Sequence, residues 1–202
     1  MSRPNRRGIR VATAAVVAAA ALVLAGCSND SLAAQYRAGD NKGFISGDFQ
    51  VQEIPADQRG DAVTFSGTTD QGTDVTSSQY LGKVVVVNFW YAACGPCRAE
   101  APVLEKAFTD VKGQDVEFLG VNIYDQAETS RSFAQTYGVS YPSVIAINNG
   151  DIKMSFAKYV PLSAVPVTVV LDKQGRVSSR IVSQLSDASI LTSLITTAGQ
   201  TS

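Results

Sequence analysis

Two cysteines, Cys94 and Cys97, are the residues best able to carry chemistry in this chain. They follow the apolar run 84–89 and precede a stretch of helical composition, so we expect them at the first turn of a helix after a buried strand. Exchange between thiols and disulfides needs one exposed thiolate and a second thiol that can attack the resulting mixed disulfide. The spacing therefore predicts a redox-active pair.

The position of each cysteine in that helix predicts its role. Cys94 lies where free backbone N–H groups and the positive end of the helix dipole stabilise a thiolate. Cys97 lies one turn deeper on the same side, so its sulfur can reach that of Cys94. We therefore expect Cys94 to attack and Cys97 to resolve. Gly95 permits close approach of a partner backbone, and Pro96 suits an early helix position that needs no N–H donor.

Half a zinc site or a static disulfide would be alternative explanations of the pair. Structural zinc normally has four ligands, whereas this chain contains no His and only one further cysteine, Cys27. No metal site is expected.

Composition describes a globular chain without an affinity for nucleic acid. A length of 202 residues suits one domain plus appendages, and 45% hydrophobic residues can form a core. The first 26 residues contain four arginines and no acid, so 13 basic and 18 acidic residues remain after them. This acidic balance provides no basic face, and no nucleic-acid partner is expected.

The N-terminus has the pattern of an export signal. Residues 1–10 are basic, and residues 11–25 are rich in Ala, Val and Leu. This apolar run is shorter than the roughly 20 residues of a transmembrane helix and is typical of a secretory signal. It ends Leu-Ala-Gly-Cys at residues 24–27, which resembles the bacterial lipobox, in which the cysteine becomes a lipidated N-terminus. An ordinary signal peptide with a chance cysteine is the alternative.

These patterns predict three parts of the chain: a lipoprotein signal peptide at 1–26, a flexible tether at 27–47 and a folded domain at 48–198. The tether is small, polar and without periodicity. Lipid on Cys27 would anchor the domain to the cell membrane on its extracytoplasmic face.

Strands and helices are expected to alternate within the domain. The patterns predict strands 62–66 and 74–76 around a turn at 68–72, strand 84–89, helix 94–111 with a kink at Pro102, strand 116–123, helix 127–137, strand 143–147, a short helix 152–158, a hairpin of 167–171 and 176–182, and helix 187–197. This order indicates an α/β sandwich with a mixed sheet.

The segment Asn88-Phe-Trp90…Cys94-Gly-Pro-Cys97-Arg-Ala-Glu100-Ala-Pro102 resembles the TlpA/ResA-like branch of the thioredoxin superfamily. Members of this branch are membrane-anchored extracytoplasmic thiol–disulfide oxidoreductases. The resemblance covers residues 48–198, including the first hairpin, Gly82-Lys83 and the segment 165–175. It implies a thioredoxin-like three-layer sandwich with a mixed central sheet and an N-terminal β-hairpin extension.

The resemblance also implies a substrate-binding surface beside Cys94. It makes Val165–Pro166 a cis peptide bond, which would leave the Val165 backbone free to pair with an incoming peptide; an ordinary trans proline is the alternative. The expected substrate-binding residues are Trp90, Gly95, Pro96, Val165 and Pro166. The chain departs from the family pattern at Ala93, where Trp is usual, so its partner-facing surface differs.

Glu100 has two interpretations. Its residue type and helical position favour a solvated carboxylate. The resemblance instead implies an acid that exchanges protons with the buried thiol, because Asn88 occupies the strand position where thioredoxins have an Asp and cannot titrate.

The implied function is reduction of disulfides in extracytoplasmic proteins, with apocytochrome c as a candidate substrate. A membrane electron-transfer protein would recharge the dithiol, no cofactor beyond the Cys94–Cys97 disulfide is expected, and the chain would be a monomer. Two alternatives remain open: a disulfide-forming oxidase, because Val before the cis proline also occurs in oxidising members, and a non-catalytic binding lipoprotein. A peroxiredoxin is disfavoured, because no Thr-x-x-Cys precedes the helix.

Overall fold

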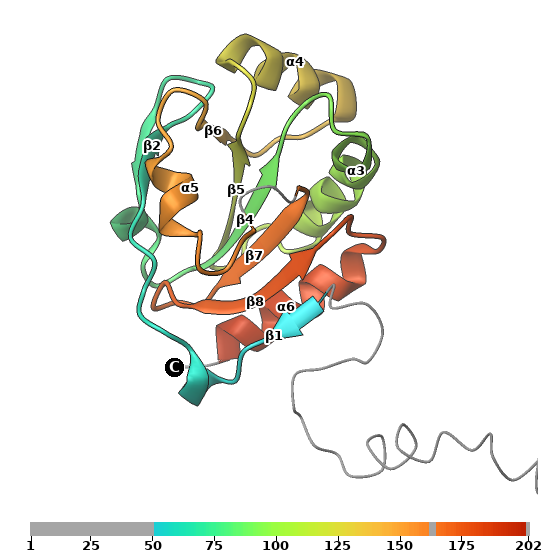
Figure 1. The fold of residues 1–202 in the computed structure, drawn as a ribbon. Helices are drawn as coiled ribbons and strands as arrows, with labels where there is room; N and C mark the ends of the chain where they lie inside the picture. The colour runs from blue at the N-terminus through green and yellow to red at the C-terminus, as the bar shows by residue number, and fades with distance from the viewer. Residues whose placement is uncertain (1–50, 162–164, 201–202) are drawn as a thin grey trace, which may run out of the picture. The chain divides into compact units, whose positions relative to one another are not determined.

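A computed structural model describes residues 51–161 and 165–200 of the chain (Figure 1). The predicted signal peptide, Cys27 and the predicted tether lie outside the described residues.

The centre of the fold is a six-stranded sheet in the order β1-β8-β7-β4-β5-β6. β4 is parallel to β5, β5 is parallel to β6, and β7 and β8 add antiparallel pairs, so the predicted mixed sheet is confirmed. The strands are β1 (Val51–Glu53), β4 (Val84–Trp90), β5 (Val116–Asn122), β6 (Ser143–Ile145), β7 (Val167–Leu171) and β8 (Val177–Val182).

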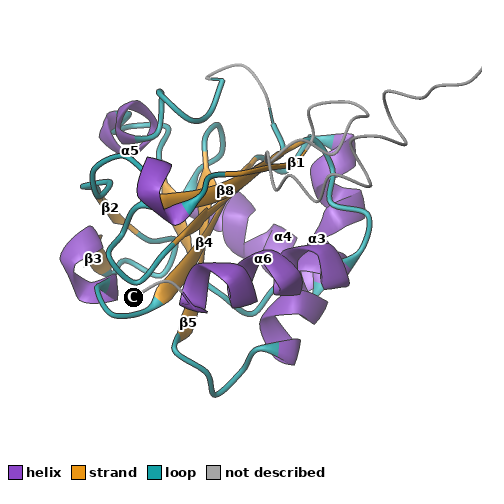
Figure 2. Cartoon of the chain, turned by 90° about the horizontal axis from the view of Figure 1, so that it is seen from below, coloured by secondary structure: helices purple, strands orange, loops and turns teal. Residues whose placement is uncertain are grey.

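The central strand β4 is buried along its whole length because both faces of the sheet are covered. Val84 and Val86 pack in a cluster with α3 (Gly95–Asp110) and α6 (Ala188–Gln200). Val85, Val87 and Phe89 point the other way, into a cluster that includes residues of α5 (Asp151–Ser155). Figures 1 and 2 show α3 and α6 on one side of the sheet and α5 on the other. The predicted three layers are therefore present.

The predicted N-terminal hairpin is present with shifted boundaries. β2 (Ser66–Thr68) pairs antiparallel with β3 (Asp74–Thr76), and the short 3-10 helix η3 (Ser77–Tyr80) follows. Residues 62–65, expected in the first strand, lie outside it. Val63 and Phe65 are buried there, and the Val63 N–H donates to the Gly175 carbonyl, so this stretch packs on the sheet without forming a ladder.

Three elements were absent from the sequence prediction: the strand β1 and the 3-10 helices η2 and η3. The strand β1 pairs with the distant β8, Val51 lying opposite Ile181, and the 3-10 helix η2 (Ala56–Gln58) follows it. The helices α3, α4 (Ala127–Tyr137), α5 and α6 correspond to the predicted helices, and Pro102 lies within α3 as expected. None of the helices in residues 51–161 and 165–200 has the length and apolar character needed to cross a membrane.

A buried ion pair joins the N-terminal segment to the turn between β7 and β8. Asp172 Oδ2 accepts from Arg59 Nη1 at 3.0 Å and from Arg176 Nε at 2.9 Å. The side chains of Asp172 and Arg59 are 0% and 2% exposed. Burial would raise the pKa of Asp172, but hydrogen bonds from the Arg176 N–H and the two guanidinium groups lower it below its ordinary value.

We expect Asp172→Ala to lower the free energy of unfolding by about 3–5 kcal/mol, because it leaves a buried guanidinium without its carboxylate. Urea denaturation monitored by circular dichroism measures this change. Asp110→Ala is the matched control, because its ion pair with Lys106 is exposed and is expected to contribute less than about 1 kcal/mol. Equal losses in the two variants would contradict the prediction.

Candidate functional site

The two cysteines lie at the start of α3, after the short loop that follows β4. Cys94 is the N-cap of α3, and its Sγ accepts a hydrogen bond from the Cys97 N–H at 3.1 Å. Cys94 and Cys97 form a disulfide with a Cα–Cα distance of 5.2 Å, which confirms the predicted pairing. Pro96 occupies the first turn, and Gly95 and Pro96 are exposed.

Cys94 is less accessible in this disulfide than an attacking thiol was expected to be. It is 4% exposed and Cys97 is 2% exposed. Both pack in a cluster with Trp90, Ala101 and Phe133. The exposed residues directly next to the two cysteines are Ala93, Gly95, Pro96 and Arg98.

Glu100 lies on the buried face of α3, three residues after Cys97, and is 1% exposed. The Asn88 side-chain amide donates to Oε1 and the Leu185 N–H donates to Oε2, each at 2.9 Å. Burial raises the pKa of Glu100 to about 7, although both hydrogen bonds favour the charged form. The interpretation as a solvated helix carboxylate is wrong, because the bonds to β4 and to the segment before α6 hold this side chain inside the protein.

Glu100 follows Cys97 by three residues on α3. Side chains three residues apart on a helix have Cβ atoms about 5–6 Å apart. Cys97 and Asn88 line a small cavity of about 10 Å³, room for about one water molecule, and Glu100 is not among the residues that line it. Asn88 is held by a second hydrogen bond to Thr168 Oγ1 at 3.1 Å, so its amide is fixed between β7 and Glu100.

The Val165–Pro166 peptide bond is cis, as the family resemblance implied. β7 begins directly after it, and Val167 pairs with Phe89 of β4. The partly buried Val165 packs against the cluster that contains both cysteines. The bond therefore lies beside the redox pair; its role in binding substrate stays a prediction.

Trp90 lies inside the protein and is 6% exposed. Its indole N–H donates to Ser143 Oγ at 3.2 Å, and its ring packs on Phe133 with centroids 4.2 Å apart. The indole passes over Gly120, where a side chain would collide with Trp90 and Ser143. Trp90 therefore packs in the buried cluster with the two cysteines and does not present its ring to a partner. This differs from its predicted place in the substrate-binding surface.

The turn after β5 holds a site residue that the sequence prediction missed. Asp125 Oδ2 accepts from the Ala92 N–H at 2.6 Å and from the Asn122 side-chain amide at 2.9 Å. Asn122 Oδ1 accepts in turn from the Asp125 N–H at 2.7 Å. An Asn-x-x-Asp after a strand is a turn signal, but it does not indicate which loop the carboxylate contacts.

Residues 59–180 match the AhpC/TSA family. The chain belongs to the AhpC/TSA family. Within residues 51–161 and 165–200, no three His, Cys, Asp or Glu side chains are grouped so as to hold a metal ion.

Sequence relatives of the chain are named thiol-disulfide oxidoreductases. The chain is 33% identical over 120 residues to the thiol-disulfide oxidoreductase ResA of Geobacillus kaustophilus, covering 59% of this chain and 66% of that protein, just under two thirds of its length. This match confirms the predicted ResA-like resemblance.

Solved structures agree with the fold. A DsbF homologue from Corynebacterium diphtheriae is similar with a TM-score of 0.64 and 25% identity, covering 76% of this chain and 96% of that one. DsbF from Mycobacterium tuberculosis, solved in mixed oxidized and reduced forms, has a TM-score of 0.60 and 26% identity, covering 72% and 99%.

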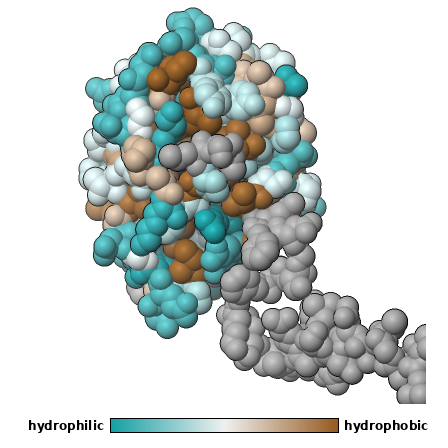
Figure 3. Space-filling view, viewed as in Figure 1, coloured by the Kyte–Doolittle hydropathy of each residue, from teal (hydrophilic) through white to brown (hydrophobic). Residues whose placement is uncertain are grey.

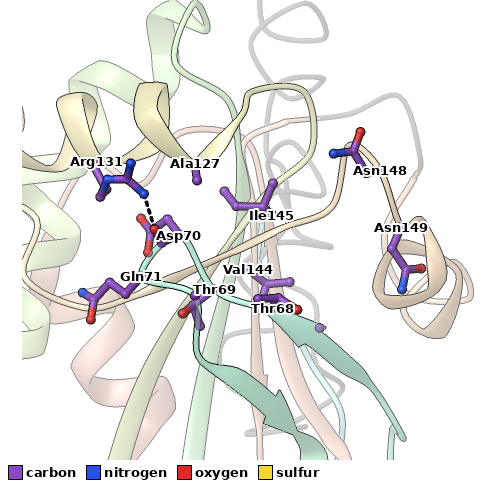
Figure 4. Close-up of a pocket in the computed structure, with 12 residues that line it drawn as sticks. Thr68, Thr69, Asp70, Gln71, Ala127, Arg131, Val144, Ile145, Asn148 and Asn149 are labelled. Carbon is purple, nitrogen blue, oxygen red and sulfur yellow. Dashed lines mark hydrogen bonds between the residues drawn. The ribbon is translucent and has the colours of Figure 1, made fainter.

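A separate pocket of about 840 Å³ opens between the β2–β3 turn, α4 and the end of β6 (Figure 4). Neither cysteine lines it. Arg131 points toward Asp70 and donates to its carbonyl, and Ser130 Oγ donates to the Asp70 carboxylate at 2.8 Å. Asp70 is 5% exposed, so these contacts brace the hairpin against α4.

Proposed function

We propose that this protein is a thiol–disulfide oxidoreductase that works through Cys94 and Cys97. The observation that carries the proposal is the disulfide at the start of α3, followed three residues later by Glu100, a buried carboxyl whose pKa is raised to about 7. Such a group can accept and return a proton near neutral pH, which thiol–disulfide exchange requires. The relatives' names support the same chemistry.

In the reducing direction, the Cys94 thiolate attacks one sulfur of a substrate disulfide. The substrate S–S bond breaks, a Cys94–substrate disulfide forms, and the released substrate thiolate takes a proton from water. Cys97 then gives its proton to the Glu100 carboxylate and attacks the Cys94 sulfur. This step forms the intramolecular disulfide and releases the second substrate thiolate. The substrate gains two electrons, and the cysteine pair loses two.

We further propose that the protein acts as a reductase on the extracytoplasmic face of the cell membrane, anchored by lipid on Cys27. The basic leader, the apolar run and the Leu-Ala-Gly-Cys motif support this location. Its substrates would be disulfides of extracytoplasmic proteins, with apocytochrome c as a candidate, and a membrane electron-transfer protein would restore the dithiol.

An oxidase that forms disulfides in secreted proteins is the second candidate. Val165 before the cis proline favours it, whereas Gly95-Pro96 between the cysteines favours a reductase.

Equilibration of the Cys94–Cys97 pair with glutathione buffers tests the direction. We expect a reduction potential of about −270 mV, the value of thioredoxin, whereas about −120 mV, the value of a strong oxidant, would overturn the reductase proposal. The oxidised fraction is measured by thiol alkylation and mass spectrometry. A pair that fails to exchange with glutathione at all would favour the non-catalytic binding protein.

A further inference from the structure

Tyr124 is an exposed aromatic residue beside the redox pair that the mechanism leaves unused. Large exposed hydrophobic side chains in the described part of the chain are Leu81, Tyr124, Ile147 and Met154. The surface in Figure 3 shows hydrophobic residues in separate patches among hydrophilic ones. Tyr124 is 60% exposed, and an exposed aromatic ring next to a reactive group indicates a contact surface.

The sheet places Tyr124 next to the loop that carries Cys94. β4 and β5 are parallel neighbours with Trp90 opposite Asn122, so the chain leaves both strands at the same edge of the sheet. Tyr91 and Tyr124 meet there edge to face, with ring centroids 5.1 Å apart and an interplanar angle of 83°. Tyr91 packs in turn against the cluster that contains Cys94 and Cys97.

Hydrogen bonds hold this aromatic pair in place. The Asp125 carboxylate accepts the Ala92 N–H, which ties the turn that bears Tyr124 to the loop that bears Tyr91. The Tyr124 N–H donates to Asn122 Oδ1 at 3.1 Å. These bonds hold the backbone of the turn, and the edge-to-face contact with Tyr91 is what orients the Tyr124 ring.

Tyr124 is the more exposed of the two rings at this surface, because Tyr91 beside it is half-buried. Ala93, the exposed residue before Cys94, has only a methyl side chain, and Trp90 is buried beneath the pair. Pro166 lies on the β7 side of β4 and Tyr124 on the β5 side. The cis Val165–Pro166 bond and Tyr124 therefore lie on opposite sides of the strand that leads to Cys94.

We propose that Tyr124 is a specificity-determining residue that binds an aromatic or large apolar side chain adjacent to the reacting cysteine of an extended polypeptide substrate. This inference rests on the proposed oxidoreductase function and deepens it. The ring offers apolar area and a π face to such a side chain, and the bond from the Ala92 N–H to Asp125 keeps the turn that bears it next to the loop that bears Cys94.

The test compares two disulfide-linked peptide dimers, Gly-Phe-Cys-Phe-Gly and Gly-Gly-Cys-Gly-Gly, as substrates of the reduced protein. We expect kcat/KM to be about tenfold higher for the aromatic peptide, which corresponds to one ring contact. In Tyr124→Ala the ratio of kcat/KM for the aromatic peptide to that for the glycine peptide should fall to near one. Tyr124→Phe should retain the tenfold ratio. Leu81→Ala is the matched control, because Leu81 is 58% exposed and precedes β4 at the opposite edge of the sheet.

Two results would overturn the inference: no preference in the unaltered protein, or the same preference in Tyr124→Ala. Binding of the serine peptide Gly-Phe-Ser-Phe-Gly, followed by NMR shifts of the backbone amides, separates the inference from the proposed function. If no disulfide is reduced but this peptide shifts the Tyr124 region and loses affinity in Tyr124→Ala, the oxidoreductase proposal fails and only the binding of an apolar side chain by Tyr124 stands. If disulfides are reduced without preference, only the inference fails.

Discussion

Replacing Cys94 with Ser is expected to lower kcat/KM for disulfide reduction by on the order of a thousandfold or more, because the attacking thiolate is lost. Reduction of bis(2-hydroxyethyl) disulfide measures the effect. Circular dichroism establishes that the variant is folded, since the substitution also removes the disulfide between Cys94 and Cys97.

Cys97→Ser is the complementary variant. It retains the attacking sulfur but cannot resolve the mixed disulfide, so we expect covalent adducts on Cys94 to accumulate. Non-reducing gels and mass spectrometry detect the adducts, and the captured proteins identify the substrates. The double variant Cys94→Ser/Cys97→Ser should capture none. Exchange that persists in Cys94→Ser, or adducts on a residue other than Cys94, would show that the roles are assigned wrongly.

Glu100→Gln is expected to slow the release of the second substrate thiol by about a hundredfold at pH 8, because general acid–base groups contribute about 10²–10⁴-fold. In the unaltered protein this step should slow as the pH falls below about 7, since the protonated Glu100 carboxyl cannot take the Cys97 proton. Single-turnover kinetics between pH 5 and pH 9 record the profile. An inflection near pH 7 that survives in Glu100→Gln would assign it to another group.

The same carboxyl makes stability depend on pH. The pKa of Glu100 rises from 4.5 to about 7 on folding, so the folded protein holds a proton that the unfolded chain has released between these values. The free energy of unfolding of the oxidised protein should therefore fall by about 3 kcal/mol between pH 4.5 and pH 7 through this group alone. Glu100→Gln should remove that decline, whereas Glu53→Gln, on the exposed end of β1, should keep it.

Local sequence patterns were sufficient to predict most of the helices and strands. α4 has the bounds predicted from its composition and Gly138, which adopts a positive φ at the helix end. β1 could not be predicted, because three residues carry little periodicity and the strand exists by pairing with the distant β8. The first strand of the hairpin shifted for a similar reason: Val63 and Phe65 satisfy the pattern of a strand but are buried by packing against the sheet.

The redox pair could be recognised from local sequence, because Cys94 and Cys97 are neighbours on one helical turn and need no distant residue to meet. Tertiary structure alone decided the surroundings of that pair. It buried Glu100 against Asn88 and Leu185, which raised the pKa of its carboxyl. It also turned Trp90 inward and brought Tyr124 beside Tyr91. Burial and contact between strands depend on segments far apart in the chain, so no local pattern records them.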